Sequence, residues 1–228
     1  MNLLITVMNY LSVSMNRHQL RNTALSIGLI ATPAIALTLM RPILSETDSY
    51  IYMNWNLFLG ILPLIFAAFH YKKVGGKMFS VLWFILWIGF LPNAPYIITD
   101  FIHIADVGPK SILWMDSIML FGFAWVGMIC WLQSVSLIYE TVRAKSFIPI
   151  ISLLTAIGLY LGRYIRFNTW DALTQPLEIV KTVLDVFLNP LNHEPFLLFI
   201  AVFWIFLMVS YVGYSNLHHL VSSPKNQS

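Results

Sequence analysis

Charged residues are scarce in this chain: Asp, Glu, Lys and Arg make up 10% of its 228 residues, whereas apolar residues make up 58%. A water-soluble domain needs roughly a quarter of its residues charged to cover its surface. The shortage excludes an ordinary soluble globular fold, and it predicts that much of the surface faces lipid.

Cysteine is nearly absent, and the positive charge is not clustered. Cys130 is the single cysteine, which excludes a disulfide framework within the chain. The net charge is only +3 and the basic residues are scattered, whereas proteins that bind nucleic acid gather lysine and arginine on one face. We therefore expect the lipid bilayer, and no nucleic acid, among its partners.

Six apolar runs fill most of the sequence, and each approaches the length of a membrane span. About 17 to 25 helical residues cross the ~30 Å hydrocarbon core of a bilayer. Backbone polar groups must be satisfied inside lipid, which favours helices, and the alternation of a transmembrane barrel is absent. The runs are residues 24–40, 55–71, 78–90, 111–139, 147–161 and 195–214.

The predicted fold is therefore all-α: a polytopic integral membrane helical bundle of about six transmembrane helices, with a short interfacial or re-entrant segment. Residues 1–23 hold an apolar run too short to span, so we expect an interfacial or poorly ordered lead. Residues 24–214 are predicted to form a single transmembrane domain, followed by a polar tail at residues 215–228. The pattern selects no oligomeric state.

Lysine and arginine are divided unevenly between the two sides of this bundle, and their excess marks the cytoplasmic side. Eight fall on one side, namely Arg17, Arg21, Lys72, Lys73, Lys77, Arg143, Lys145 and Lys225. Five fall on the other, namely Arg41, Lys110, Arg163, Arg166 and Lys181. Both termini are therefore predicted inside the cell, and the segments 90–110 and 162–194 outside.

Segment 162–194 contains an amphipathic pattern at helical spacing. Its apolar residues share one side of a helical wheel: Leu177, Val180, Val183, Leu184, Phe187 and Leu188. Its polar residues take the other side: Glu178, Lys181, Thr182 and Asp185. Such a helix is predicted to lie along the outer interface with its apolar side down. We favour a surface cover over a substrate gate.

Polar residues interrupt the third apolar run in the stretch "FLPNAPYIITDFIHIADVGPK", residues 90–110. Pro92 and Pro95 disfavour helix, so residues 91–96 are predicted to be non-helical backbone near membrane depth. Residues 96–105 are predicted to form a short helix. On that helix the side chains of Thr99, Asp100, His103 and Asp106 fall within an arc of about 120°.

This arc admits three functional hypotheses. Asp100, His103 and Asp106 could hold a divalent metal ion. His103 could be a general base that a carboxylate orients, or the group could relay protons. The alternative is that these residues only solvate the outer rim, which we favour for Asp106 and Lys110 taken alone. Since acids in membrane-embedded segments are costly, we favour function for Asn93, Tyr96, Asp100 and His103 together.

A second polar constellation, "LGRYIRFNTWD", spans residues 161–171. Arg163 and Arg166 are three residues apart, a spacing that lets two guanidinium groups on a helix converge on one phosphate or carboxylate. The alternative is that arginine and aromatic side chains merely anchor a helix end at the interface. Because both constellations are predicted on one side, we expect a joint site. Asp116 is either a third contributor or an acid that favours its helix N-terminus.

The strings "FLPNAPYIITDFIH" and "GRYIRFNTWD" together resemble an uncharacterised bacterial integral-membrane family of unknown function, over roughly residues 50–214. The family typically has Ser in place of Thr169 and often Trp in place of Phe167; the hydroxyl and the aromatic ring are kept. The resemblance implies a bacterial plasma membrane but neither substrate nor reaction. Its signature positions are Asn93, Pro95, Tyr96, Thr99, Asp100, His103, Gly162, Arg163, Arg166, Asn168, Trp170 and Asp171.

These observations lead to one functional hypothesis: an outward-facing polar site that binds or processes an anionic lipid-linked or envelope molecule. Asp100, His103 and Asp171 would supply acid/base or metal chemistry. The substrate would be held or oriented by Asn93, Tyr96, Arg163, Arg166, Asn168 and Trp170.

The rival hypothesis is a non-enzymatic small transporter or an accessory membrane subunit. A transporter places ionisable residues near the bilayer midplane in broken helices. Here they cluster toward one end, which disfavours it, while the two prolines keep it open. Whether the chain is an enzyme does not follow from the sequence.

Overall fold

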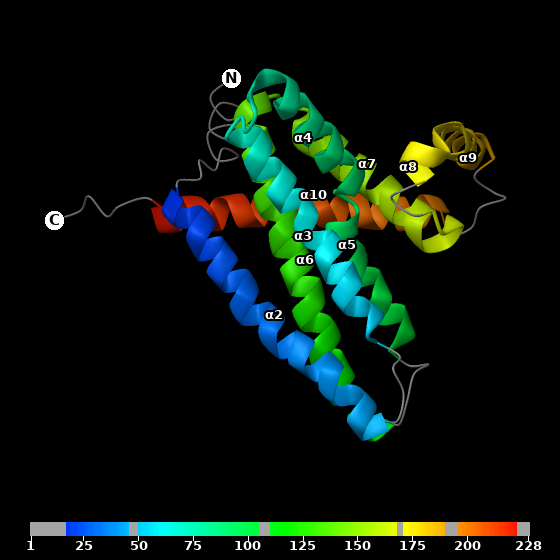
Figure 1. Ribbon diagram of the computed structural model, residues 1–228. Coiled ribbons are helices and arrows are strands. Elements are labelled where there is room, and N and C mark those ends of the chain that lie inside the picture. Colours follow the sequence, from blue (N-terminus) through cyan, green and yellow to red (C-terminus); the bar gives the residue numbers. More distant parts are fainter. Residues whose placement is uncertain (1–16, 46–49, 105–109, 168–170, 190–195, 223–228) are drawn as a thin grey trace. The chain divides into compact units, whose positions relative to one another are not determined.

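The computed structural model describes residues 17–45, 50–104, 110–167, 171–189 and 196–222, and this part of the chain is helical without a β-strand (Figure 1). Six helical stretches are long and apolar enough to cross a membrane. They are Asn22–Leu44, Tyr52–Tyr71, Gly76–His103, Lys110–Val142, Phe147–Ile165 and Phe196–His218. The prediction of an all-α chain with about six membrane helices is confirmed.

The described chain forms two compact units, which meet in sequence between Ser134 and Val135, inside α6. The first unit contains α2 (Arg17–Ser45), α3 (Tyr52–Tyr71), α4 (Gly76–Phe90), α5 (Asn93–Tyr96), the 3-10 helices η1 (Ile97–His103) and η2 (Lys110–Ile112), and most of α6 (Leu113–Val142). The second contains the end of α6, α7 (Phe147–Tyr160), the π-helical turn η3 (Leu161–Ile165), α8 (Asp171–Thr174), α9 (Pro176–Leu188) and α10 (Phe196–Ser222).

A tight turn joins α3 to α4 in the first unit and lets the two helices pack along each other. The backbone at Gly75 and Gly76 has φ of 79° and 87°, a left-handed conformation that glycine adopts without steric cost. Beyond the turn, the ring of Phe66 stacks on Trp83 with centroids 6.1 Å apart. The predicted second and third helices are thereby held as a hairpin.

Two glycines let α5 approach its neighbours closely. A Cβ atom added at Gly60 of α3 would lie 3.3 Å from the Asn93 carbonyl oxygen, and one added at Gly127 of α6 would collide with the Ala94 carbonyl oxygen. Ala94 itself is fully buried. Small residues permit such backbone contacts between membrane helices. We call residues 90–110, which contain Pro92 and Pro95, the proline segment. Its position is fixed where α5 packs on α3 and α6.

The proline segment itself corrects one prediction. α4 ends at Phe90, as expected from Pro92, but residues 93–96 form a helical turn instead of non-helical backbone. Pro92 occupies the N-cap, and Pro95 falls within the first four residues of α5, whose N–H groups have no intrahelical partner anyway. The prolines thus restart the helix without removing a needed donor, and η1 continues it.

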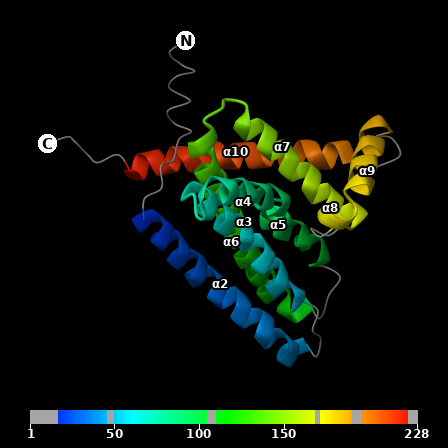
Figure 2. The same ribbon diagram turned by 45° about the horizontal axis from the view of Figure 1, so that its top comes forward.

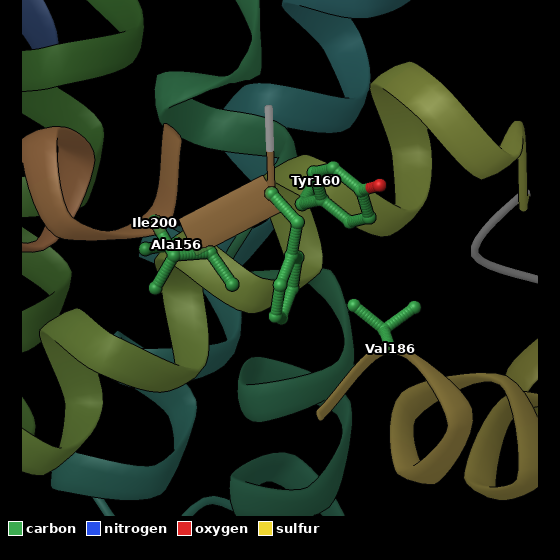
Figure 3. Packing of buried hydrophobic residues seen from close by; sticks show 5 residues of the cluster. Ala156, Tyr160, Val186 and Ile200 are labelled. Carbon is green, nitrogen blue, oxygen red and sulfur yellow. The ribbon is translucent and has the colours of Figure 1, made fainter. Parts of the chain in front are cut away.

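In the second unit α7 packs on α10, and α9 joins them through one apolar cluster (Figure 3). Tyr160 of α7 meets Phe196 of α10 edge to face, with centroids 4.7 Å apart. Val186 of α9 closes the cluster and is 1% exposed. The predicted amphipathic segment is therefore a helix, and it is fastened to the membrane helices rather than detached.

We predict that Gly127→Ala lowers stability by about 1–3 kcal/mol, because a methyl group there must displace the backbone of Ala94. The matched control is Gly89→Ala in α4, where an added Cβ meets no atom within 4 Å. The fraction of each variant that stays monodisperse in detergent after heating measures the difference. Equal heat resistance of the two variants would contradict the close packing of α5 on α6.

Candidate functional site

Asp100 is the most buried ionisable residue among residues 90–104, the part of the proline segment that the structure describes continuously. Its side chain lies in η1, the residue is 1% exposed, and the Asn56 side-chain amide donates a hydrogen bond of 3.2 Å to its Oδ2 atom. Asn56 belongs to α3, so the second membrane helix holds the carboxylate in place. The segment therefore contains a buried carboxylate whose position is fixed by a hydrogen-bond donor from α3.

The arc predicted for an α-helix changes because η1 is a 3-10 helix. With three residues per turn, side chains at positions i and i+3 eclipse one another. Asp100 and His103 therefore share one row along η1, while Thr99 lies about a third of a turn away. Asp106, the fourth member of the predicted arc, lies outside the described residues.

An ion pair that the sequence analysis missed lies beside this segment. Arg41 of α2 donates to Asp116 of α6 through Nε at 2.7 Å and Nη2 at 3.0 Å, and each side chain is 1% exposed. Arg41 was predicted in an outer loop, but α2 continues to Ser45, so Arg41 is part of that helix. Asp116 thus has a partner within its own unit, beyond its place in the first turn of α6.

Tyr50 connects the ion pair to η1. Its ring lies 4.5 Å from the Arg41 guanidinium carbon, at cation–π distance, and its hydroxyl donates to the His103 carbonyl oxygen at 3.2 Å. The residue is 1% exposed. The buried side chain of Tyr50 therefore contacts both the Arg41–Asp116 ion pair and the last residue of η1.

A third polar link completes this end of the first unit: the Asn54 amide donates to Thr38 Oγ1 at 3.1 Å, joining α3 to α2. We call the group the polar end; it consists of Thr38, Arg41, Tyr50, Asn54, Asn56, Asp100, His103 and Asp116. The sequence places the missed members at the ends of apolar runs, but it does not show which residues they contact. Arg41 closes an apolar run just before Pro42, and Asn54 and Asn56 flank Trp55 where the next run starts.

Asn93 and Thr99 have local structural bonds. The Asn93 amide donates to the Phe90 carbonyl oxygen at 3.1 Å, which satisfies a backbone group at the end of α4. The Thr99 hydroxyl donates to the Tyr96 carbonyl oxygen at 2.6 Å. These bonds shape the segment; the expected roles of Asn93 and Tyr96 in orienting a substrate stay predictions.

The arginine constellation lies in the second unit and does not form an ordinary α-helix. α7 passes into the π-helical turn η3 at Leu161, and Arg166 follows it with φ of 64°, in the left-handed region. Arg163 and Arg166 therefore do not have the α-helical spacing that would make their guanidinium groups converge. Arg166 is exposed and Arg163 half-buried.

Other members of this constellation are only partly described. Asn168 and Trp170 lie outside the described residues. Asp171 begins the short helix α8, where its carbonyl oxygen accepts a 2.7 Å hydrogen bond from the Gln175 backbone N–H. Because Asp100 and Arg163 belong to different units, the joint site stays a hypothesis.

The metal hypothesis has limited support from the donor set. Within the described ranges no three His, Cys, Asp or Glu side chains gather closely enough to hold an ion. Asp100 and His103 offer one carboxylate and one imidazole, whereas a catalytic zinc usually has three protein ligands. A divalent ion stays a prediction that depends on a further ligand such as Asp106.

Comparison with known proteins places the chain in a family. The family model described as "Protein of unknown function (DUF1361)" matches residues 55–210, which include both motif segments. The resemblance to a family of unknown function is thereby confirmed. No curated protein and no solved structure matches the chain.

We predict that removing one partner of the buried ion pair, by Arg41→Met or Asp116→Leu, costs about 3–5 kcal/mol, because a charge is left buried without its partner. The double variant should regain most of that loss, since two apolar side chains need no counter-charge. Thermal stability in detergent measures each variant.

The control for this cycle is Lys77→Met, which removes an exposed charge at the start of α4. A substitution at an exposed position usually changes stability by less than about 0.5 kcal/mol, so this variant should melt close to the parent protein. Losses in the two single variants that simply add in the double variant would show that Arg41 and Asp116 are not coupled.

Proposed function

The chain belongs to the DUF1361 family, and on that premise we propose that it is a multi-pass membrane protein that binds or processes an anionic lipid-linked or envelope molecule. The proposed location is the plasma membrane of a bacterial cell, with the polar end facing outward. The proposal rests on one observation above all, the buried carboxylate of Asp100.

Burial of Asp100 is costly in free energy, which is why it supports function over chance. An acid within a membrane segment is expensive even when it is paired, and such residues usually mark sites for ions, protons or substrates. The Asn56 amide donates a hydrogen bond of 3.2 Å to the carboxylate and offsets part of this cost. A merely structural position could hold an asparagine or a threonine at lower cost.

The roles that we propose follow from the side-chain chemistry. Asp100, His103 and Asp171 transfer protons or, with Asp106, hold a divalent ion. Arg163 and Arg166 bind the anionic group, which their forked guanidinium groups suit. Asn93, Tyr96, Asn168 and Trp170 orient the bound molecule. The contributions of the two motifs are tested separately, because they lie in different units.

We predict that Asp100→Asn abolishes complementation of a strain that lacks the gene, although asparagine keeps the shape and polarity of the side chain. The readout is a profile of membrane lipids and envelope components, in which the deletion strain and the variant should show the same altered species. Arg163→Ala should give the same change if the arginines hold the anionic group.

The matched control is Glu178→Gln, which neutralises an exposed acid on α9, outside the proposed machinery. It should restore the parental profile. Immunoblots of the membrane fraction must show equal amounts of each variant. Full complementation by both Asp100→Asn and Arg163→Ala would refute the proposed function and leave a structural role.

A transporter is the second candidate, and one observation favours it. The apolar stretch Gly76–His103 is interrupted at Leu91 and Pro92, so that this span is a broken helix, as in transporter sites. The same profile separates the two candidates. A transporter lacking Asp100 leaves its cargo chemically unchanged on the wrong side of the membrane, whereas an enzyme leaves an unprocessed precursor.

We predict that cysteines placed at Lys77 and Arg143 react with a membrane-impermeant thiol reagent only after the cells are opened, because both exposed positions should face the cytoplasm. A cysteine at Lys110, exposed on the opposite side in this topology, should react in intact cells. The single native thiol, Cys130, is buried and gives a low background. Labelling of Lys77→Cys in intact cells would show that the chain has the opposite orientation in the membrane.

A further inference from the structure

Helix α9 presents one of its faces to the protein. Val186 is 1% exposed and packs in the cluster formed by Ala156 and Tyr160 of α7 and by Phe196 and Ile200 of α10 (Figure 3). The half-buried residues Ile179, Thr182 and Val183 lie on the same side of the helical wheel. This protein-facing side lies between the two sides of the amphipathic pattern, and it takes Val183 from the apolar side and Thr182 from the polar side.

The remaining surface of α9 is exposed and divided into two sectors. One sector is wholly apolar and spans about 100° of the helical wheel. Its members and their exposed fractions are Leu177 at 74%, Val180 at 54%, Leu184 at 54%, Phe187 at 48% and Leu188 at 76%. The adjoining sector holds the exposed charged residues Glu178, Lys181 and Asp185. α9 therefore meets three different environments around its circumference.

The direction of α9 fits a membrane surface. In Figure 1 α9 is seen nearly end-on while α10 lies across the view, and in Figure 2 α9 lies across the direction of α10. The apolar stretch Phe196–His218 of α10 is long enough to cross the bilayer, and crossing helices tilt on average by only about 20° from the membrane normal. A helix that lies across α10 therefore lies roughly parallel to the membrane plane.

The apolar sector is also continuous with a lipid-facing surface. Phe187 at its edge contacts Phe196, with ring centroids 5.3 Å apart, and Phe196 begins α10. The next two residues of α10, Leu197 and Leu198, are 56% and 69% exposed, as expected for side chains that face acyl chains. One apolar surface therefore passes from the first turn of α10 onto α9.

From this geometry we infer that α9 lies along the membrane surface at the side where α10 begins. Lipid at the boundary between headgroups and acyl chains covers its apolar sector. Its apolar sector enters the lipid, its charged sector faces water, and Val186 fastens it to the bundle. Glu178 and Asp185 outnumber Lys181, so attraction to anionic headgroups does not drive the insertion. Apolar burial drives it instead.

The test uses the full-length chain in phosphatidylcholine nanodiscs, with a single added cysteine that carries an environment-sensitive fluorophore. Leu177→Cys and Leu184→Cys probe the apolar sector, and Glu178→Cys and Asp185→Cys are the matched controls one position away. The wild-type chain, with its buried Cys130, gives the labelling blank. Quenching is measured with aqueous iodide and with lipids that carry a nitroxide near the headgroup or near the chain end.

The apolar-sector probes should be quenched severalfold more by the nitroxide near the headgroup than by iodide, and the charged-sector probes should show the reverse order. Addition of phosphatidylglycerol should leave this pattern unchanged. Strong iodide quenching at all four positions would place α9 in water and overturn the inference. Protection of Leu184→Cys from every quencher would show that protein covers it, and strongest quenching from the chain end would show deep insertion; either result overturns it too.

Discussion

The buried ion pair between Arg41 and Asp116 is the interaction on which the first unit depends. A guanidinium and a carboxylate that are each 1% exposed must remain paired, because either charge alone is expensive to bury. The pair therefore specifies how the end of α2 meets the start of α6. Apolar packing in lipid could not do so alone, since the lipid competes equally for apolar surface.

Tyr50 connects the ion pair to η1: its ring contacts the Arg41 guanidinium and its hydroxyl donates to the His103 carbonyl oxygen. From the other side, Gly60 and Gly127 clamp α5 at backbone distance. Asp100 lies between these two constraints, with its carboxylate held by an amide from α3. A site fixed in this manner loses little conformational entropy when it binds a ligand, which is the advantage of preorganisation.

Features that depend on local chemistry could be predicted from the sequence. Apolar length alone indicated the six membrane helices, Pro92 indicated the end of α4 at Phe90, and periodicity indicated α9. These signals are short in range, because they reflect solvent and backbone constraints within one element. They say which element forms, and they do not say what it touches.

Features that depend on distant partners could not be predicted. Arg41 and Asp116 are 75 residues apart, so a loop charge and a buried ion pair look alike in the sequence. The first residue of η1, Ile97, packs near Gly60 of α3 and Gly127 of α6, which no periodicity records. The 3-10 form of η1 moves Thr99 away from the row that Asp100 and His103 share. The π turn that places Arg166 in the left-handed region is similarly absent from any α-helical wheel.

The inferred depth of α9 bears on the substrate that we propose for Arg163 and Arg166. Tyr160 and Val186 share one apolar cluster, and Arg163 follows Tyr160 by three residues in the same chain direction. With α9 at the headgroup boundary, Arg163 lies within about one helical turn, roughly 5 Å, of that level. A guanidinium at this depth meets phosphates that are carried by lipids before it meets solutes in the bulk water. The proposed depth of α9 therefore supports the part of the proposed function that assigns a lipid-linked anion rather than a soluble one.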